Sequence, residues 1–465
     1  SFRCASKGRK NRFGSKHRAR LAAAKLRVES LEQRCLLAAD MLAVTGELSD
    51  GSPDQFSAHQ PTWQERVAYV AQQVAGSEHY FLDELGNVRA ETPNLPAAPP
   101  KEESGKDDSD SGFSTQSPPY PYAQTFLLNS LPTSKHTIYL DFTGHTTTGT
   151  LWNSQITGGA AIVTPPFSFE GDGSFSNAEL QRIQQIWERV AEDFRPFNVN
   201  VTTQEPALHR LIRTGEFDEE WGIRVVIGPD NWYPGTFGGV AYVGSFNWSN
   251  DTPTFVFSNH LFNDEKYVAE AISHEVGHTL GLFHDGTSTV EYYEGHGSGA
   301  TGWAPIMGVG YYQELVQWSK GEYPGANNTQ DDTLVIVLTG GHGLSYRTDD
   351  HGDTTASATL LSIAPSTWAV SASGIVERSW DIDYFRFETS GGQITLSIDP
   401  FYLSPNLDIR ARVYNSVGSV IATSNPVNSL GASFNLNLAN GTYYVSVEGI
   451  GKAASGSDYG YSLHN

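Results

Sequence analysis

The sequence predicts an α+β protein that ends in an all-β sandwich. Two observations lead to this prediction. Between residues 129 and 345, short apolar runs typical of β-strands alternate with stretches of helical periodicity. Beyond residue 349, runs of alternating apolar and polar residues follow one another, separated by Gly, Pro, Asn and Ser. With 465 residues, 38% of them hydrophobic, the chain can bury more than one core.

Charge is distributed unevenly along the chain. Residues 1–35 carry 11 Lys and Arg against 2 acids, so the remainder carries 19 against 50. Such an acidic body repels phosphates, and we therefore expect no nucleic acid among its partners. No stretch of 18 or more apolar residues exists, so we expect no transmembrane segment.

Residues 1–40 are basic and then weakly apolar, a pattern that fits a nucleic-acid arm, a solvated helix or an export leader. The stretch from Val28 to Asp40 resembles the L-E-x-R-x-L-L leader of many secreted bacterial proteins. This resemblance implies export to the outside of the cell or to the cell envelope. Both cysteines, Cys4 and Cys35, lie in the leader. We therefore expect no cysteine thiol from the rest of the chain to act as an inhibitory switch.

Two further segments precede the main body. Residues 41–90 contain a helical pattern between Trp63 and Val74 and a strand signal at residues 80–82, and they are either a small pro-segment or a spacer. Residues 91–128, with their prolines and the charged run 101–110, cannot bury enough apolar surface to fold. We predict a disordered linker there.

Between residues 129 and 345, strand and helix signals follow one another closely. Ser176 followed by Glu179 is a capping box at the start of an amphipathic helix. Glycines flank an expected strand at 238–245, in which apolar and polar residues alternate. The expected strands cover 137–142, 198–203, 223–227, 238–245 and 254–258, and the expected helices cover 177–194 and 265–281.

The second of these helices carries three histidines at metal-ligand spacing. His274 and His278 are four residues apart, which places both imidazoles on one helical face. Gly281 can adopt a left-handed conformation, end the helix and return His284 to the same ion. Three ligands leave a fourth position for water, as in catalytic zinc sites. Glu275, next to the first ligand, is placed to act as a general base.

The string HEVGHTLGLFHD, with Met307 in the downstream segment APIMG, resembles the zinc signature and Met-turn of the metzincin metallopeptidases. The resemblance implies a metzincin-like domain over residues 129–345, with a twisted mixed sheet, a zinc-binding helix and one catalytic zinc ion. It also implies a downstream methionine in a tight turn, which Met307 supplies. Asp285, as in the reprolysin branch, is expected to support the fold without binding metal.

The resemblance also assigns a binding role to part of the strand at 238–245. In metzincins the similar strand borders the cleft and pairs with the substrate backbone, which here would involve Gly239, Val240 and Ala241. An ordinary hairpin strand is the alternative. Val309 stands where two other branches have a tyrosine ligand, and core packing is expected for the nearby Tyr311 and Tyr312.

After Met307, helices are expected at 313–320 and 329–339, the second capped by Asn328 or Thr329. Asp331 and Asp332 lack the alternating spacing of a calcium loop, so no specific motif supports Ca²⁺.

The tail, residues 349–465, predicts a sandwich with strands at 384–387, 393–398, 409–414, 433–438 and 443–447. Its acidic motifs, 349–354 and 381–387, resemble the bacterial pre-peptidase C-terminal domain carried by many secreted peptidases. This domain is a candidate for contact with a cell surface or polymer.

Together these features predict a secreted zinc endopeptidase that acts on proteins or peptides. Two alternatives remain open at the sequence level. One is a non-catalytic extracellular adhesion or matrix protein with a structural zinc site, although such a site would normally close the fourth ligand position. The other is a zinc amidase acting on cell-wall peptide.

Overall fold

The computed structural model of the chain describes residues 77, 79–83, 86–93, 117–171, 174–338, 342–362 and 369–451. The chain divides into two compact units, Ser1–Arg89 and Ala90–Asn465. The expected leader, most of the expected pro-segment and the middle of the expected linker lie outside the described residues. Among the helices that the structure describes, none combines the length and the apolar character that crossing a membrane requires.

In the first unit, β1 (Tyr80–Leu82) and the beginning of β2 (Val88–Pro93) are the described strands. The carboxylate of Asp83 accepts a hydrogen bond of 2.7 Å from the backbone N–H of Asn87 and so closes the turn between them. The strand β1 agrees with the sequence prediction for residues 80–82. The last four residues of β2 belong to the second unit.

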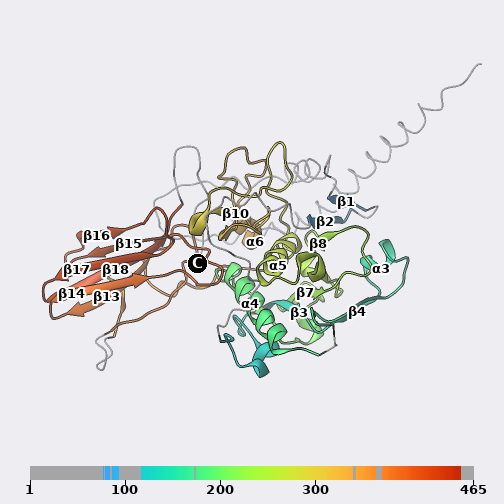
Figure 1. The fold of residues 1–465 in the computed structure, drawn as a ribbon, viewed down its shortest axis with the longest axis horizontal. Helices are drawn as coiled ribbons and strands as arrows, with labels where there is room; N and C mark the ends of the chain where they lie inside the picture. The colour runs from blue at the N-terminus through green and yellow to red at the C-terminus, as the bar shows by residue number, and fades with distance from the viewer. Residues whose placement is uncertain are drawn as a thin grey trace, which may run out of the picture. The chain divides into compact units, whose positions relative to one another are not determined.

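A mixed sheet forms the centre of the second unit (Figure 1). β3 (His136–Asp141) pairs in parallel with β6 (Asn200–Thr202) and β7 (Trp221–Gly228). β7 also pairs in parallel with β9 (Thr254–Phe257), whereas β8 (Phe237–Tyr242) runs antiparallel to β9. Every residue of β7 is buried, as expected for a central strand covered on both faces. In order across the sheet, the strands are β2, β8 (Phe237–Tyr242), β9 (Thr254–Phe257), β7 (Trp221–Gly228), β3 (His136–Asp141) and β6 (Asn200–Thr202).

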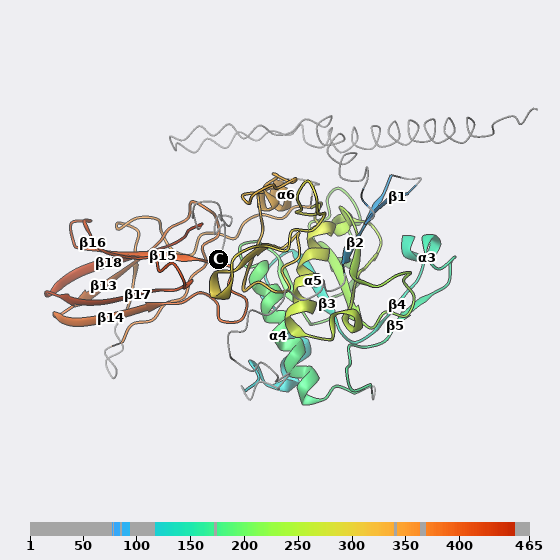
Figure 2. The same cartoon turned by 45° about the horizontal axis from the view of Figure 1, so that its top comes forward.

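Two long helices, α4 (Asn177–Asp193) and α5 (Glu265–Thr279), lie side by side against this sheet (Figures 1 and 2). The capping box at the start of α4 is formed as predicted: Ser176 Oγ accepts from the N–H of Glu179, and Glu179 Oε2 accepts from the N–H of Ser176. The core between the helices and the sheet includes residues from Leu128 to Leu344, close to the bounds expected for this domain.

Shorter elements complete this part of the chain. They are the α-helices α3 (Leu151–Gln155) and α6 (Asp332–Leu338), the strands β4 (His145–Thr147), β5 (Ile162–Thr164), β10 (Trp303–Pro305) and β11 (Leu315–Gln317), and the 3-10 helices η1 (Tyr122–Leu127), η2 (Leu208–Arg210), η3 (Ser245–Asn247), η4 (Ser258–Leu261) and η5 (Gly299–Thr301).

A buried ion pair crosses the sheet. Arg224 on β7 donates to Asp141 at 2.7 Å and to Asp251 at 3.0 Å, and only 7% of its side chain is exposed. Because the charge is removed from water, it depends on these two carboxylates.

Three expectations for this region need correction. The segment 313–320 is not helical: Leu315–Gln317 forms β11, parallel to β10. Its three residues are all buried, which suits an extended chain between neighbours and not an amphipathic surface helix. The cap of α6 is Asp331, whose Oδ1 accepts from the N–H of Thr333 and Leu334, so neither Asn328 nor Thr329 caps it. Two parts of the expected linker, 91–93 and η1, are regular elements.

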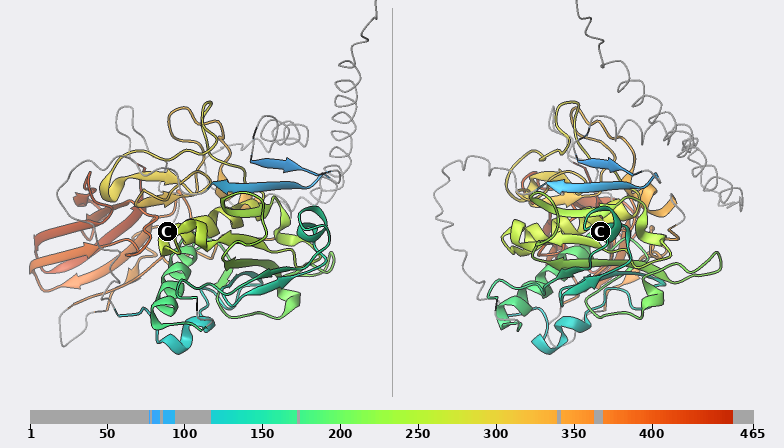
Figure 3. Two further views of the ribbon diagram at one scale, coloured as in Figure 1. Left: turned by 45° about the vertical axis from the view of Figure 1, so that its right-hand side comes forward. Right: turned by 90° about the vertical axis from the view of Figure 1, so that its right-hand side faces the viewer.

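The tail forms the predicted β-sandwich, drawn in orange and red in Figures 1 and 3. All five predicted strands are present, and β12 and β16 are additional. Apolar side chains of the two sheets, among them Val413 and Phe434, share one core. The first sheet has the order β12 (Thr359–Leu360), β13 (Asp383–Thr389), β18 (Gly441–Gly449), β15 (Ile409–Tyr414), β16 (Val420–Ser424), and the second pairs β14 (Gly392–Ile398) with β17 (Ala432–Leu438). The α+β class is therefore confirmed.

Candidate metal centre and cleft

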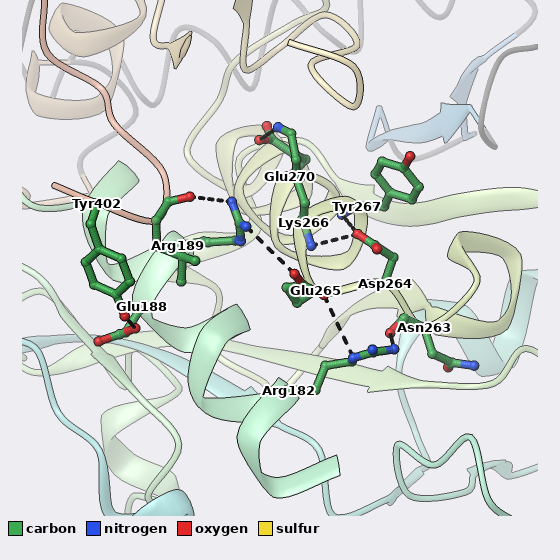
Figure 4. Close-up of polar contacts among 11 residues, drawn as sticks. Arg182, Glu188, Arg189, Asn263, Asp264, Glu265, Lys266, Tyr267, Glu270 and Tyr402 are labelled. Atoms are coloured by element: carbon green, nitrogen blue, oxygen red, sulfur yellow. Dashed lines mark hydrogen bonds and ion pairs between the residues drawn. The ribbon is translucent and has the colours of Figure 1, made fainter. Parts of the chain in front are cut away.

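The helix α5 is fixed at its start by a side-chain cap. The carboxylate of Asp264 accepts hydrogen bonds from the N–H of Lys266 at 2.9 Å and of Tyr267 at 3.1 Å (Figure 4). Glu265 lies 3.9 Å from both Arg182 and Arg189 of α4. These contacts tie the first turn of α5 to α4.

A second connection lies nearer the centre of α5. Ser273 Oγ donates a hydrogen bond of 2.5 Å to Asp193 at the end of α4, and Asn406 Nδ2 of the C-terminal part donates to the same carboxylate at 2.7 Å. Asp193 is buried, and burial, reinforced by Glu270, raises the pKa of its carboxyl to about 8. Because Ser273 precedes His274, this network sets the rotation of α5 where its first histidine leaves the helix.

The structure brings the three predicted histidines together. One ring nitrogen from each of His274, His278 and His284 lies within 4.8 Å of the others, and all three residues are buried. His278 Nε2 and His284 Nε2 are 3.1 Å apart. Two nitrogens bound to one tetrahedral zinc at roughly 2.0–2.1 Å would be about 3.3 Å apart.

The other ring nitrogens have partners that fix the tautomers. Nδ1 of His274 lies 2.9 Å from the Ile306 carbonyl, and Nδ1 of His278 lies 2.9 Å from the Leu282 carbonyl. Nδ1 of His284 lies 3.1 Å from the carboxylate of Glu291. Since these acceptors require N–H donors at Nδ1, the neutral rings direct the lone pairs of Nε2 toward one another.

This arrangement fits a metal ion. His274 Nε2 is buried and has no hydrogen-bond partner in the structure. Burial lowers the pKa of His274 to about 4, and burial together with the neighbouring imidazoles lowers the pKa of His278 well below its usual range. Both rings are therefore neutral near pH 7, as metal ligation requires. The residues form a site that could bind a metal ion.

Gly281 has the role that the sequence predicted. Its φ is +98°, the N–H of Leu282 bonds to the carbonyl of Gly277, and the N–H of Gly281 bonds to the carbonyl of His278. These are the two hydrogen bonds of a Schellman motif, which ends the helix and turns the chain. His284 returns to the other two histidines through this turn.

Met307 lies in a tight turn that packs against α5. Its side chain is buried, and its sulfur would lie 2.5 Å from a Cβ added at Gly277 of α5. The N–H of Asp285 donates to the Met307 carbonyl at 2.8 Å. The turn thus holds the segment that follows α5 beside the helix itself. The same turn also brings the Ile306 carbonyl to His274.

Asp285 does not belong to the group of converging metal-ligand atoms among the described residues. Its side chain is buried, and this burial raises the pKa of the carboxyl to about 8. The neighbouring Asp332 is also buried, with a pKa well above its usual range because of burial and of Asp285. The burial of Asp285 agrees with the expectation that it supports the fold, and this role stays a prediction.

Glu275 is buried beside the histidines. The hydroxyl of Thr92 in β2 donates a hydrogen bond to Oε1 of its carboxylate, and its Oε2 has no partner in the structure. Burial raises its pKa well above the usual range. A buried carboxylate with an unpartnered oxygen next to a metal-ligand set can accept a proton from water.

The residues expected to bind substrate, Gly239, Val240 and Ala241, are buried in β8. A Cβ added at Gly239 would lie 2.6 Å from Glu275 Oε1, so only glycine allows β8 to approach this carboxylate so closely. β8 has β9 on one side and β2 on the other. The place expected for substrate beside β8 is thus taken by the chain itself.

Four residues of this site were not predicted. Glu291 contacts His284, and the Tyr292 ring lies 4.3 Å from the His284 ring, measured between centroids. The Tyr292 hydroxyl donates to the Glu91 carbonyl at 2.5 Å, and the Tyr233 hydroxyl donates to the Glu91 carboxylate. None of these tyrosines or acids has a motif spacing relative to the histidines that would have identified it.

The C-terminal part contains two groups of carboxylates whose oxygens lie within 4.8 Å of one another: Asp349 with Glu377 and Asp381, and Asp349 with Asp350 and Asp383. Acidic groups of this kind are common without an ion, and calcium remains without a specific motif.

Comparison with known proteins adds no family: no protein-family model matches the chain, and no curated protein matches it.

Proposed function

We propose that the protein is a zinc-dependent endopeptidase of the metzincin type, exported by a bacterium. One observation carries this proposal: three imidazoles bring one ring nitrogen each within 4.8 Å of the others on the segment that contains Glu275, and Glu275 accepts a hydrogen bond from Thr92, a residue of the chain itself. A site for peptide hydrolysis requires this combination of an open metal position, a base and a bound peptide.

The donor set favours zinc. Three neutral imidazoles without a fourth protein ligand are typical of catalytic zinc sites, whereas structural zinc is usually closed by four ligands. A bound zinc ion would supply Lewis acidity, which makes water a nucleophile near pH 7 and polarises a carbonyl.

The protein's own residues would perform the remaining steps. Glu275 would accept the proton of the attacking water and then give it to the nitrogen of the departing amine. Tyr292 would donate a hydrogen bond to the carbonyl oxygen as negative charge develops there. β8 would hold the substrate backbone as an added strand. The burial of Glu275 and of the histidines would keep competing water away.

Peptide hydrolysis and metal content test this proposal separately. We expect Glu275→Gln in the full-length protein to keep one zinc ion per chain and to lose hydrolysis of a quenched peptide library. A chelator should abolish the activity of the unsubstituted protein. Undiminished hydrolysis by Glu275→Gln would refute the proposed mechanism.

A pair of histidine variants distinguishes ligation from a general effect. His278→Ala should lose zinc, as measured by elemental analysis after gel filtration. His209 is exposed and lies outside the triad, so His209→Ala should retain the ion. Equal zinc content in the two variants would remove His278 from the metal site.

A further inference from the structure

A segment of the chain lies beside Glu275. Residues 90–93, the last part of β2, lie next to β8 in the sheet (Figure 1). Ala90, Glu91 and Thr92 are buried. On the proposed function this is the position of a substrate strand, so the contacts of these residues indicate what the cleft recognises.

The two residues that form the Glu91–Thr92 peptide bond both have partners at the site. The carbonyl oxygen of Glu91 accepts from the Tyr292 hydroxyl at 2.5 Å, and the hydroxyl of Thr92, the residue that supplies the nitrogen of this bond, donates to the carboxylate of Glu275. Hydrolysis needs a donor at the carbonyl oxygen and an acid at the leaving nitrogen. The Glu91–Thr92 bond therefore lies where a bond to be hydrolysed would lie, and Glu91 occupies the position on its carbonyl side.

The side chain of Glu91 is also bound. The Tyr233 hydroxyl donates a hydrogen bond to its carboxylate, and both residues are buried, at 3% and 6% exposure. The Tyr233 ring is held by other aromatic rings, with centroids 5.3 Å away for Trp232 and 5.7 Å for Phe257. A phenol fixed in a buried position needs an acceptor, because leaving it unpaired costs free energy.

We propose that Tyr233 is a specificity-determining residue that selects a glutamate side chain on the carbonyl side of the hydrolysed bond, and that Glu91 is the internal occupant of this subsite. The assignment of the hydrolysed bond rests on the proposed function. A side chain of similar length without an acceptor would lose the hydrogen bond that the Tyr233 hydroxyl donates to Glu91. Glutamine would accept the hydrogen bond without the contribution of a charge.

Binding without hydrolysis tests the subsite. The protein is the full-length chain with Glu91→Ala, which vacates the subsite, and Glu275→Gln, which prevents turnover. The probes are fluorescent peptides Arg-Ala-Xaa-Thr-Pro in which Xaa is Glu, Gln or Met, followed by anisotropy. We expect the Glu peptide to bind about tenfold more tightly than the Met peptide, with Gln between them.

The added substitution Tyr233→Phe should remove this difference. Tyr346→Phe is the matched control: its hydroxyl donates to Thr333 at 2.7 Å, away from the cleft, so the tenfold ratio should persist. Equal affinity for the Glu and Met peptides, or a ratio that survives Tyr233→Phe, would overturn the proposal.

If no peptide displaces residues 90–93, hydrogen exchange tests the contact between Tyr233 and Glu91. In the otherwise unsubstituted full-length chain, Tyr233→Phe should accelerate amide exchange at Thr92 by about tenfold relative to Tyr346→Phe. Unchanged exchange at Thr92, together with the absence of peptide binding, would overturn the proposal. Neither measurement uses turnover, so a protein that hydrolyses no peptide would refute the proposed function and leave the binding ratio intact.

Discussion

Gly239→Ala tests how closely β8 approaches the candidate base. The added methyl group would lie 2.6 Å from Glu275 Oε1, 2.7 Å from Glu275 Cγ and 2.8 Å from the backbone oxygen of Phe255. The Phe255 oxygen belongs to the neighbouring strand β9, so it cannot move without disturbing the sheet. Forcing a methyl group into such a space typically costs about 1–3 kcal/mol of folding free energy.

We expect Gly239→Ala to lower the free energy of unfolding in urea by this amount and to reduce peptide hydrolysis at least tenfold. Zinc content should not change, because the nearest neighbours of the added methyl group include no histidine. Gly215→Ala is the control, since its new methyl group would meet nothing within 4 Å. A Gly239→Ala variant with unchanged stability and a rate within a factor of two would refute the inferred contact between β8 and Glu275.

Three further predictions concern charged groups. Because burial raises the folded pKa of Asp193 from 3.8 to about 8, the stability from its bound proton is complete below about pH 4 and lost as the pH rises through about 8. The urea midpoint should therefore fall across this range, and Asp193→Asn should flatten the fall; parallel profiles would contradict the shift. Glu291→Gln should weaken zinc affinity about tenfold or more in a chelator competition, whereas Glu294→Gln should not, and equal affinities would exclude the contact with His284. Arg224→Met leaves one buried carboxylate, Asp141, and one partly buried carboxylate, Asp251, without their partner and should cost about 3–5 kcal/mol of unfolding free energy, whereas Lys135→Met at the surface should cause no measurable change. Similar urea midpoints for these two variants would contradict the burial of the ion pair.

The features that the sequence predicted correctly are mostly local. The helical placement of His274 and His278 follows from their spacing, and the turn at Gly281 follows from the conformational freedom of glycine. The sandwich strands follow from alternation over four to six residues, which the fold preserves because one face of each sheet packs on the other. The capping box at Ser176 is likewise complete within four residues.

The features that were missed depend on distant partners. Leu315–Gln317 is a strand because β10 pairs with it and the core surrounds it, and neither condition is encoded within the segment itself. Glu91 and Thr92 stand at the beginning of a segment whose composition predicts disorder. They are nevertheless ordered, because Thr92 meets Glu275 across 183 residues of sequence. Glu291, Tyr292 and Tyr233 reach the site through loops, whose course composition does not determine.

If residues 90–93 use the groups that a substrate would use, then latency and specificity depend on the same contacts. A strand of the same chain competes at an effective concentration that is typically of millimolar order, so the intact protein would hydrolyse micromolar peptides slowly. Weakening the strand through Glu91→Ala should therefore raise hydrolysis of a glutamate-containing peptide. Weakening the subsite through Tyr233→Phe should release the strand and impair binding of that same peptide, so its net gain should be smaller. A larger gain for Tyr233→Phe than for Glu91→Ala would show that the strand and the substrate are held by different residues.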